Sequence, residues 1–118
     1  MELLEQIARA ALKRDHLTLR SLIQDWVRSG AHIQDFSRPS FTDSRLLVIS
    51  AAVVELLAER RKESPPAWTM EIGSLSEPFF MLESASSMKR LRALCETQSP
   101  EPMRKRLLYA PPHFLEFA

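Results

Sequence analysis

Cysteine and glycine are both scarce in this chain, and each scarcity removes a class of site. Cys95 is the one cysteine among 118 residues, which excludes an internal disulfide and a cysteine-based zinc site of the usual kind. Glycine occurs twice, which argues against the glycine-rich loops that hold nucleotide phosphates. The first residues also lack the basic region and long apolar core of a signal peptide. We therefore expect a protein of the reducing cytoplasm.

A strong net charge and a long apolar run are missing as well. The formal net charge is +1, so the chain as a whole has no electrostatic attraction to nucleic acid or to anionic membranes. The most apolar stretch, residues 45–58, is too short to span a membrane and is soon followed by charge. The hydrophobic fraction of 45% is ordinary for a globular chain, and 118 residues suit one domain.

The apolar stretch 45–58 predicts the helix around which the rest of the chain packs. Its length, the cap oxygens of residues 42–44 before it and Pro65-Pro66 after it favour a helix over a buried strand. It is apolar nearly all the way round, which is typical of a helix at the centre of a fold. Inside the stretch, Ser50 is expected to bond back to a carbonyl one turn earlier and Glu55 to mark a narrow solvent-facing strip.

Two amphipathic helices are predicted before the central one. Apolar residues at helical spacing indicate helices over 2–14 and 16–28, with Asp15 capping the second and Gly30 ending it. Such a short link predicts an antiparallel hairpin. The buried side of the second helix is expected to hold five residues: Leu19, Leu22, Ile23, Trp26 and Val27. The loop 30–43 is expected to be anchored in the core by Ile33, Phe36 and Phe41.

The second half of the chain is richer in proline and aromatic residues. Residues 64–85 predict an extended segment with one short strand at most. A helix is expected over 86–97, capped by Ser86 or Ser87, with its buried face made of Met88, Leu91, Leu94 and Cys95. Another is expected to start at Ser99-Pro100 and to run to about Leu107. The apolar tail 113–118 is expected to dock, onto its own domain or onto a partner.

Together these elements predict a single all-α domain over 1–118. It consists of an N-terminal helical hairpin (1–30), a central buried helix (43–63), an extended Pro/aromatic linker (64–85) and basic helices with an apolar tail (86–118).

Residues suited to catalysis or metal binding are few and scattered. No histidine is four residues from another or close to the cysteine, so no metal site and no cofactor are predicted. Cys95 lies on an apolar helix face and is expected to be a buried structural thiol. Arg106 and His113 have the spacing used by small helical ribonucleases. Ala110-Pro111-Pro112 breaks the helix between them, so this third hypothesis is the weakest and no catalytic residue is assigned.

Basic residues gather in the segment 88–108 and provide an alternative hypothesis. A nucleic-acid-binding regulator would use Lys89, Arg90, Arg92, Arg104, Lys105 and Arg106 to contact phosphates. The segment shows no recognition helix with short polar base-reading side chains. A solvated basic face is therefore favoured over a nucleic-acid site.

Aromatic and proline residues provide the leading hypothesis, which is binding to a protein. Such side chains offer a large contact area at small entropic cost. Each one alone is more often a core residue, but a domain of this size is not expected to bury all of them. The candidate partner-binding residues are Trp68, Phe79, Phe80, Tyr109, Pro111, Pro112, Phe114 and Phe117.

Short word-like motifs in residues 45–118 carry a family resemblance. They are Pro65-Pro66-Ala67-Trp68, Glu77-Pro78-Phe79-Phe80, residues 91–96, residues 99–102 and residues 108–115. With these motifs the chain resembles a small uncharacterised bacterial family met beside nucleotidyltransferase-like genes, in arrangements similar to toxin–antitoxin pairs. The resemblance implies an antitoxin-like or accessory partner of a nucleotidyltransferase-type enzyme.

The resemblance and the residues lead to the same expectation. We expect a non-enzymatic interaction protein that binds a protein partner, a second copy of itself in a homodimer, or both. Its action would be steric, by occluding or stabilising an enzyme's active site, with basic residues steering an acidic patch of the partner.

Overall fold

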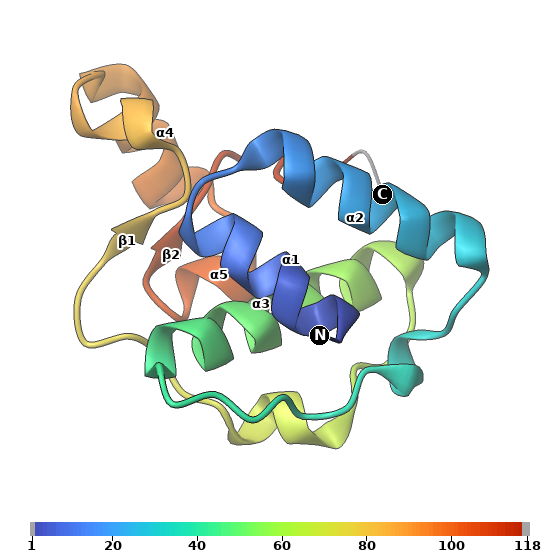
Figure 1. Ribbon diagram of the computed structural model, residues 1–118. Coiled ribbons are helices and arrows are strands. Elements are labelled where there is room, and N and C mark those ends of the chain that lie inside the picture. Colours follow the sequence, from blue (N-terminus) through green and yellow to red (C-terminus); the bar gives the residue numbers. More distant parts are fainter. Residues whose placement is uncertain (1, 117–118) are drawn as a thin grey trace.

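The computed structural model describes residues 2–116 and shows a mainly helical protein (Figure 1). Its α-helices are α1 (Leu3–Leu12), α2 (His16–Ser29), α3 (Ser44–Arg61), α4 (Lys89–Gln98) and α5 (Glu101–Arg104). Three short 3-10 helices lie between them, η1 (Ile33–Asp35), η2 (Ala67–Glu71) and η3 (Glu83–Ser86). The predicted fold class is confirmed, with one small parallel sheet added. Over residues 2–116 no helix has the length and apolar character needed to cross a membrane.

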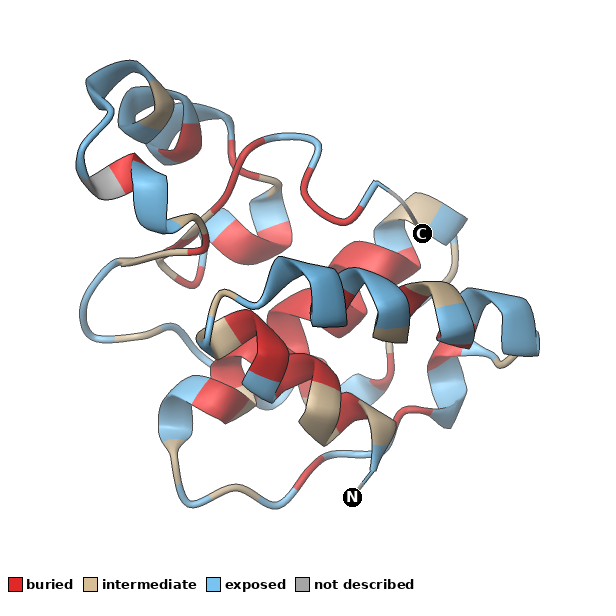
Figure 2. Ribbon diagram, turned by 45° about the horizontal axis from the view of Figure 1, so that its top comes forward, coloured by how far each residue is buried: buried red, intermediate tan, exposed pale blue. Residues whose placement is uncertain are grey.

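Helix α3 forms the centre of the molecule, as its composition predicts (Figure 2). All residues from 48 to 58 are buried. The Asp43 carboxylate caps the helix by accepting a 2.9 Å hydrogen bond from the Arg45 main-chain N–H. Lys62 ends it in the left-handed conformation at φ 56°, so the helix closes before Pro65 is reached. Ser50 donates to the Leu46 carbonyl at 2.8 Å, which confirms the expected bond back along the helix.

The first two helices form the predicted hairpin, and α1 packs against both α2 and α3. Small residues such as Ala8 and Ala11 are fully buried on α1 and allow close approach to α3. The Asp15 side chain accepts from Thr18 N at the start of α2, and Gly30 ends that helix at φ 72°. Both caps were predicted. The expected burial of Val27 is wrong, because its side chain is 39% exposed.

The loop after α2 is held down by the residues predicted to anchor it. Ile33 and Phe36 are buried, and the Phe36 ring stacks on Trp26 with 5.2 Å between ring centroids. Trp68 closes this region by donating its indole N–H to the Phe36 carbonyl at 2.9 Å. The segment around Trp68 was expected to be extended. It forms η2 instead, with Thr69 bonded to the Pro66 carbonyl.

A two-stranded parallel sheet joins distant parts of the second half. Strand β1 (Phe79–Phe80) pairs with β2 (Leu108–Tyr109), with Phe79 beside Leu108 and Phe80 beside Tyr109. The connection between the strands runs outward through η3 and α4 and returns through α5 (Figure 1). The Phe79-Phe80 pair is therefore the one short strand that the sequence allows in residues 64–85.

The last helix is shorter than predicted, and its start is capped differently. Helix α5 ends at Arg104, and Leu107 turns the chain into β2 with a left-handed φ of 62°. Ser99 does not cap α5. Its hydroxyl accepts a 2.8 Å bond from Ala110 N and also contacts the Cys95 carbonyl, which ties the end of α4 to the tail.

The apolar tail docks on its own domain, which is one of the two arrangements expected for it. Phe114 is 6% exposed and Leu115 is 1% exposed, and both belong to the main hydrophobic cluster. The tail is therefore part of the core over the residues that the structure describes. Phe117, which is among the candidate partner-binding residues, lies outside the described residues.

Candidate functional site

Glu55 and Arg106 form a buried ion pair that the sequence did not predict. Arg106 Nη1 lies 2.7 Å from Glu55 Oε1, and Nη2 lies 3.0 Å from Oε2. Both side chains are nearly inaccessible, at 6% exposed for Glu55 and 3% for Arg106. The expectation that Glu55 faces solvent is wrong, because α5 and η2 cover that side of α3.

Arg106 also fixes the main chain around it. Its guanidinium donates to the carbonyls of Thr69 at 2.9 Å, Pro102 at 3.1 Å and Ile72 at 3.3 Å. These contacts join α3, η2 and α5 through one side chain. Burying a charge is costly unless the charge is paired and hydrogen-bonded, and this arrangement meets both conditions. Arg106 is therefore a structural residue and is not available to bind a phosphate from solvent.

A second cation shares the Glu55 carboxylate. Lys105 Nζ lies 2.9 Å from Glu55 Oε1, with its own side chain half exposed. Burial alone would raise the pKa of Glu55, but the hydrogen bonds from Arg106 and Lys105 outweigh it and hold that pKa below its ordinary value. Glu55 is thus an ionised anchor for two cations.

The six basic residues of the nucleic-acid hypothesis are not gathered into one phosphate-binding surface. Arg106 and Lys105 are bound to Glu55, and Arg104 is exposed and donates to the Thr97 carbonyl at 3.0 Å. Arg92 pairs with Glu96 at 3.1 Å. The remaining two, Lys89 and Arg90, are exposed at the start of α4. The inclusion of Arg106 in an exposed basic face is therefore wrong, which also removes it from the ribonuclease hypothesis.

The aromatic set is largely occupied by contacts within the chain. Pro111 and Phe114 are buried, and Trp68 is half-buried with its N–H bonded to Phe36. Pro112 is exposed, and its carbonyl lies 3.4 Å from Arg60 Nη2. These residues act mainly as core and offer a partner only part of their surface.

The other three aromatic residues form a junction at the small sheet. We use the term aromatic junction for Phe79, Phe80 and Tyr109, all of them half-buried. The Phe80 and Tyr109 ring centroids are 5.4 Å apart. The guanidinium carbon of Arg92, in α4, lies 5.0 Å from the centroid of the Phe80 ring. That of Arg14, which follows α1, lies 4.5 Å from the centroid of the Phe79 ring. Each of the two phenylalanine rings thus makes a cation–π contact with an arginine.

Beyond the junction, residues 82–98 form a lobe that projects from the rest of the described chain, which we call the body (Figures 1 and 2). Its helix α4 packs mainly against η3. Ala85 and Cys95 are fully buried in the lobe but lie outside the main hydrophobic cluster. Burial raises the pKa of the Cys95 thiol, and Glu96 adds to this effect. The predicted structural role of Cys95 agrees with its burial.

The rest of the predicted apolar face of α4 is not buried. Met88 is 55% exposed and Leu94 is 39% exposed, while Leu91 is half-buried. Helix α4 also begins three residues later than predicted, after Met88 and without a side-chain cap. The face that a helix would normally turn to the core is thus partly left in solvent. Lys89 and Arg90 lie beside it and form no ion pair with any residue of the described range 2–116.

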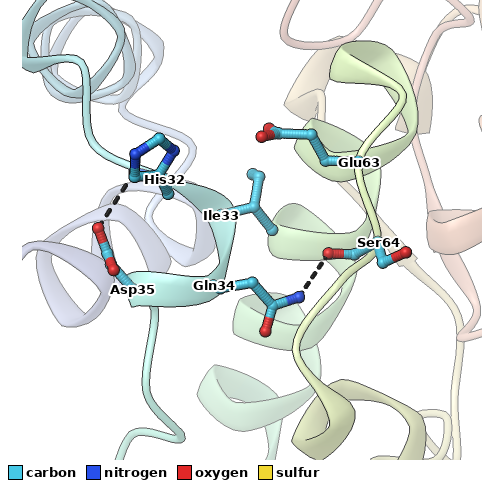
Figure 3. A pocket seen from close by; sticks show the side chains of 6 residues that line it. All are labelled: His32, Ile33, Gln34, Asp35, Glu63 and Ser64. Carbon is cyan, nitrogen blue, oxygen red and sulfur yellow. Dashed lines mark hydrogen bonds between the residues drawn. The ribbon is translucent and has the colours of Figure 1, made fainter.

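A cleft of about 490 Å³ lies between η1 and the segment after α3 (Figure 3). Buried Ile33 lies between exposed His32 and the Glu63 carboxylate, which extends toward that side. The polar contacts close the turn, since Asp35 accepts from the His32 main-chain N–H and Gln34 donates to the Ser64 carbonyl. Within residues 2–116 no three side chains are grouped to hold a metal ion. The polar groups that line the cleft thus close the η1 turn and hold it against the segment after α3.

Comparisons with models of protein families, with curated proteins and with solved structures find no match to this chain. The resemblance carried by the motifs of residues 45–118 therefore stays a prediction. The lobe remains the surface that the internal packing of the chain explains least.

Proposed function

We propose that this protein is a non-enzymatic interaction protein of the cytoplasm whose lobe, residues 82–98, binds an acidic partner protein. One observation carries the proposal. Helix α4 presents exposed Leu94 and Met88 next to Lys89 and Arg90, which have no ion-pair partner within residues 2–116. Apolar anchors with unpaired charge at their edge are typical of a binding surface.

The small core of the lobe supports this proposal. Ala85 and Cys95 are its fully buried apolar residues among those described, and neither offers much apolar area. Few buried contacts mean low local stability. A partner that covers Leu94 and Met88 would add the burial that the lobe lacks, at about 25 cal/mol for each Å² of apolar surface removed from water.

The unpaired charges select the chemistry of the partner. Arg92 is neutralised by Glu96, but Lys89 and Arg90 project beyond it with their charges uncompensated. Acidic side chains facing Lys89 and Arg90 would steer association and fix its orientation. In line with the resemblance, the partner would be a nucleotidyltransferase-type enzyme, which the lobe would occlude or stabilise as an antitoxin-like or accessory protein does.

Co-expression with a nucleotidyltransferase-type protein, the kind of partner that the resemblance implies, tests the proposal. We expect a complex on size exclusion with light scattering, and weaker binding at high salt. The variant K89E/R90E/L94S should weaken binding by about tenfold or more, which corresponds to about 1.4 kcal/mol. The matched control L17S/R28E changes one exposed apolar and one exposed basic residue on α2 and should bind as the unchanged protein does.

Three outcomes would contradict the proposal. One is that the two proteins elute separately at micromolar concentrations. Another is that the chain alone is a dimer that L94S converts to a monomer, which would assign the lobe to a second copy. The third is retention of RNA that K89E/R90E abolishes, which would favour the nucleic-acid alternative.

A further inference from the structure

Arg14 follows helix α1 at a position where glycine is the usual residue. Its φ of 57° lies in the left-handed region, which Gly30 occupies at the end of α2. The Arg14 N–H bonds the Ala11 carbonyl at 3.0 Å, so the residue closes the last turn of α1. This main-chain conformation is unfavourable for a residue with a side chain. An arginine in place of glycine therefore indicates that the side chain itself is used.

The Arg14 side chain reaches strand β1, 66 positions further along the chain. Its Nε–H donates to the Phe80 carbonyl at 2.9 Å, and its guanidinium carbon lies 4.5 Å from the centroid of the Phe79 ring. Arg14 forms no ion pair with any residue of the range 2–116. A hydrogen bond from a charged donor is stronger than one between neutral groups. Arg14 thus ties the helical hairpin to β1.

The Phe80 carbonyl belongs to the edge of β1 that faces away from β2. The main-chain N–H groups of Phe79 and Met81 donate to carbonyls of residues 107 and 109, at 2.9 and 2.8 Å. Successive residues of a strand turn their main-chain groups to opposite edges, so Phe80 presents its carbonyl to the other edge. Arg14 supplies the donor that a third strand would supply there. Strand β1 is therefore held from both edges.

The lobe is attached to the body at two ends, where the chain leaves through β1 and returns to α5 (Figure 1). Met81, just before the lobe, is fully buried in the main hydrophobic cluster. At the other end, Ser99 accepts from the Ala110 N–H at 2.8 Å. Attachment at two ends leaves a rotation about the line that joins them. Because α4 packs mainly against η3, which is part of the lobe, a further contact is needed to prevent this rotation.

The aromatic junction provides that further contact. The guanidinium carbon of Arg92, in the lobe, lies 5.0 Å from the centroid of the Phe80 ring. The main-chain carbonyl of the same phenylalanine accepts from Arg14, in the body. One arginine of the lobe and one of the body thus meet at Phe80, and a shift of Phe80 would move a support of α4.

We propose that Arg14 is a positioning residue that fixes the orientation of the lobe on the body. It holds β1, and β1 supports α4 through the Phe80 ring. The exposed face of α4 is then presented to a partner in one orientation, although Arg14 lies outside that face. The consequence for binding rests on the proposed function, whereas the orientation of the lobe is measured on the protein alone.

Residual dipolar couplings of the ¹⁵N-labelled full chain test the proposal. In the unchanged protein we expect the lobe and the body to fit one common alignment. Arg14→Met removes the donor and the charge, so the couplings of residues 82–98 should shrink relative to those of the body. Hydrogen exchange at the Met81 amide, next to the released carbonyl, should become about tenfold faster.

Two further variants separate positioning from general stability. Arg14→Gly adopts the left-handed turn without strain, so it should loosen the lobe without lowering the midpoint of global urea unfolding. Arg9→Met is the matched control, because Arg9 belongs to α1 and lies 5.6 Å from the centroid of a ring in the body, that of Phe41. It should leave the couplings of the lobe unchanged.

Two results would overturn the proposal. One is a common alignment of lobe and body in both Arg14 variants, with unchanged exchange at Met81. The other is an equal acceleration of exchange at Met81 and throughout α1, which would make Arg14 a general stabilising residue. With a partner that binds the lobe, Arg14→Met should weaken binding severalfold, because the lobe must then be ordered on association. A partner that binds no variant and not the unchanged protein would remove the proposed function, and the couplings would still decide the role of Arg14.

Discussion

Glu55 and Arg106 are 51 positions apart in the chain and are joined by two parallel hydrogen bonds of 2.7 and 3.0 Å inside the protein. One belongs to the middle of the central helix and the other follows α5. Because Arg106 also bonds three carbonyls, the pair fixes where η2 and α5 lie on α3. It is the clearest internal constraint on the second half of the fold.

Breaking this pair from the carboxylate side should destabilise the protein strongly. Glu55→Leu leaves the Arg106 charge buried without a carboxylate, and we expect a loss of about 3–5 kcal/mol in the free energy of unfolding. Arg106→Met should be damaging for a different reason. It removes the donor to the Pro102 and Ile72 carbonyls, while the Thr69 carbonyl keeps the Ile72 N–H and Lys105 still neutralises Glu55. Urea unfolding of both single variants and of the double variant measures the coupling between them.

The double variant provides the control for this prediction. If the charge pair matters, E55L/R106M should be more stable than the sum of the two single losses implies, because neither charge is left alone. Strictly additive losses would show that the two residues act separately.

Acid should weaken the fold through the same carboxylate. The folded-state pKa of Glu55 is below its ordinary value of 4.5, so the unfolded state binds its proton more readily. The stabilisation is therefore complete above about pH 4.5 and is lost as the pH falls through the folded-state pKa. Glu55→Gln should be less stable than the unchanged protein near neutral pH, and the difference should shrink on acidification. A pH-independent difference would show that Glu55 does not titrate with folding.

The glycines offer a matched pair for a backbone prediction. Gly30 ends α2 at φ 72°, a conformation that costs other residues about 1–2 kcal/mol. Gly30→Ala should lower the free energy of unfolding by that amount. Gly73 has no positive φ and no neighbour within 4 Å of a Cβ, so Gly73→Ala should leave stability equal or slightly higher. Thermal unfolding of the two variants decides the matter, and equal losses would contradict the assignment of the Gly30 cap.

The first half of the fold could be predicted because its signals are local. Each signal depends only on residues close together in the chain. Examples are the apolar face around Ile7, the cap oxygen of Asp43 and the helix end at Gly30. The Glu55–Arg106 pair could not be predicted, because it depends on how η2 and α5 cover α3. A lone Glu inside an apolar helix was the available signal, and it is equally compatible with a solvent-facing strip.

The candidate site was missed for a related reason. Helical spacing groups Met88, Leu91, Leu94 and Cys95 on one side of α4, but spacing does not say whether another element covers that side. Here α4 packs against η3, and of these four residues only Cys95 is fully buried. Phe114, a predicted partner-binding residue, is buried in the core. The exposed apolar side chains are instead Met88 and Leu94, on a helix face that was expected to be buried.

Ser99 should be important for holding the lobe to the tail. Its hydroxyl is buried and accepts the Ala110 N–H at 2.8 Å. Ser99→Ala leaves this buried donor without an acceptor, which we expect to cost about 1–3 kcal/mol. Hydrogen exchange should be faster at Ala110 in the variant and unchanged at residues of α1. Unchanged exchange at Ala110 would show that water or another group takes the place of the hydroxyl.

The Cys95 thiol reports on opening of the lobe. It is fully buried, and burial raises its pKa, so it should react slowly with a disulfide reagent near neutral pH. Because Cys95 and Ala85 lie outside the main hydrophobic cluster, we expect the lobe to open at a lower free energy than the whole protein unfolds. Labelling should then become fast at urea concentrations that leave the far-ultraviolet circular dichroism intact. Glu55→Gln, which weakens the body, should change this local rate much less than it changes global unfolding. Binding of a partner over Leu94 should slow the labelling further, whereas labelling that follows global unfolding in every variant would show that lobe and body form one cooperative unit.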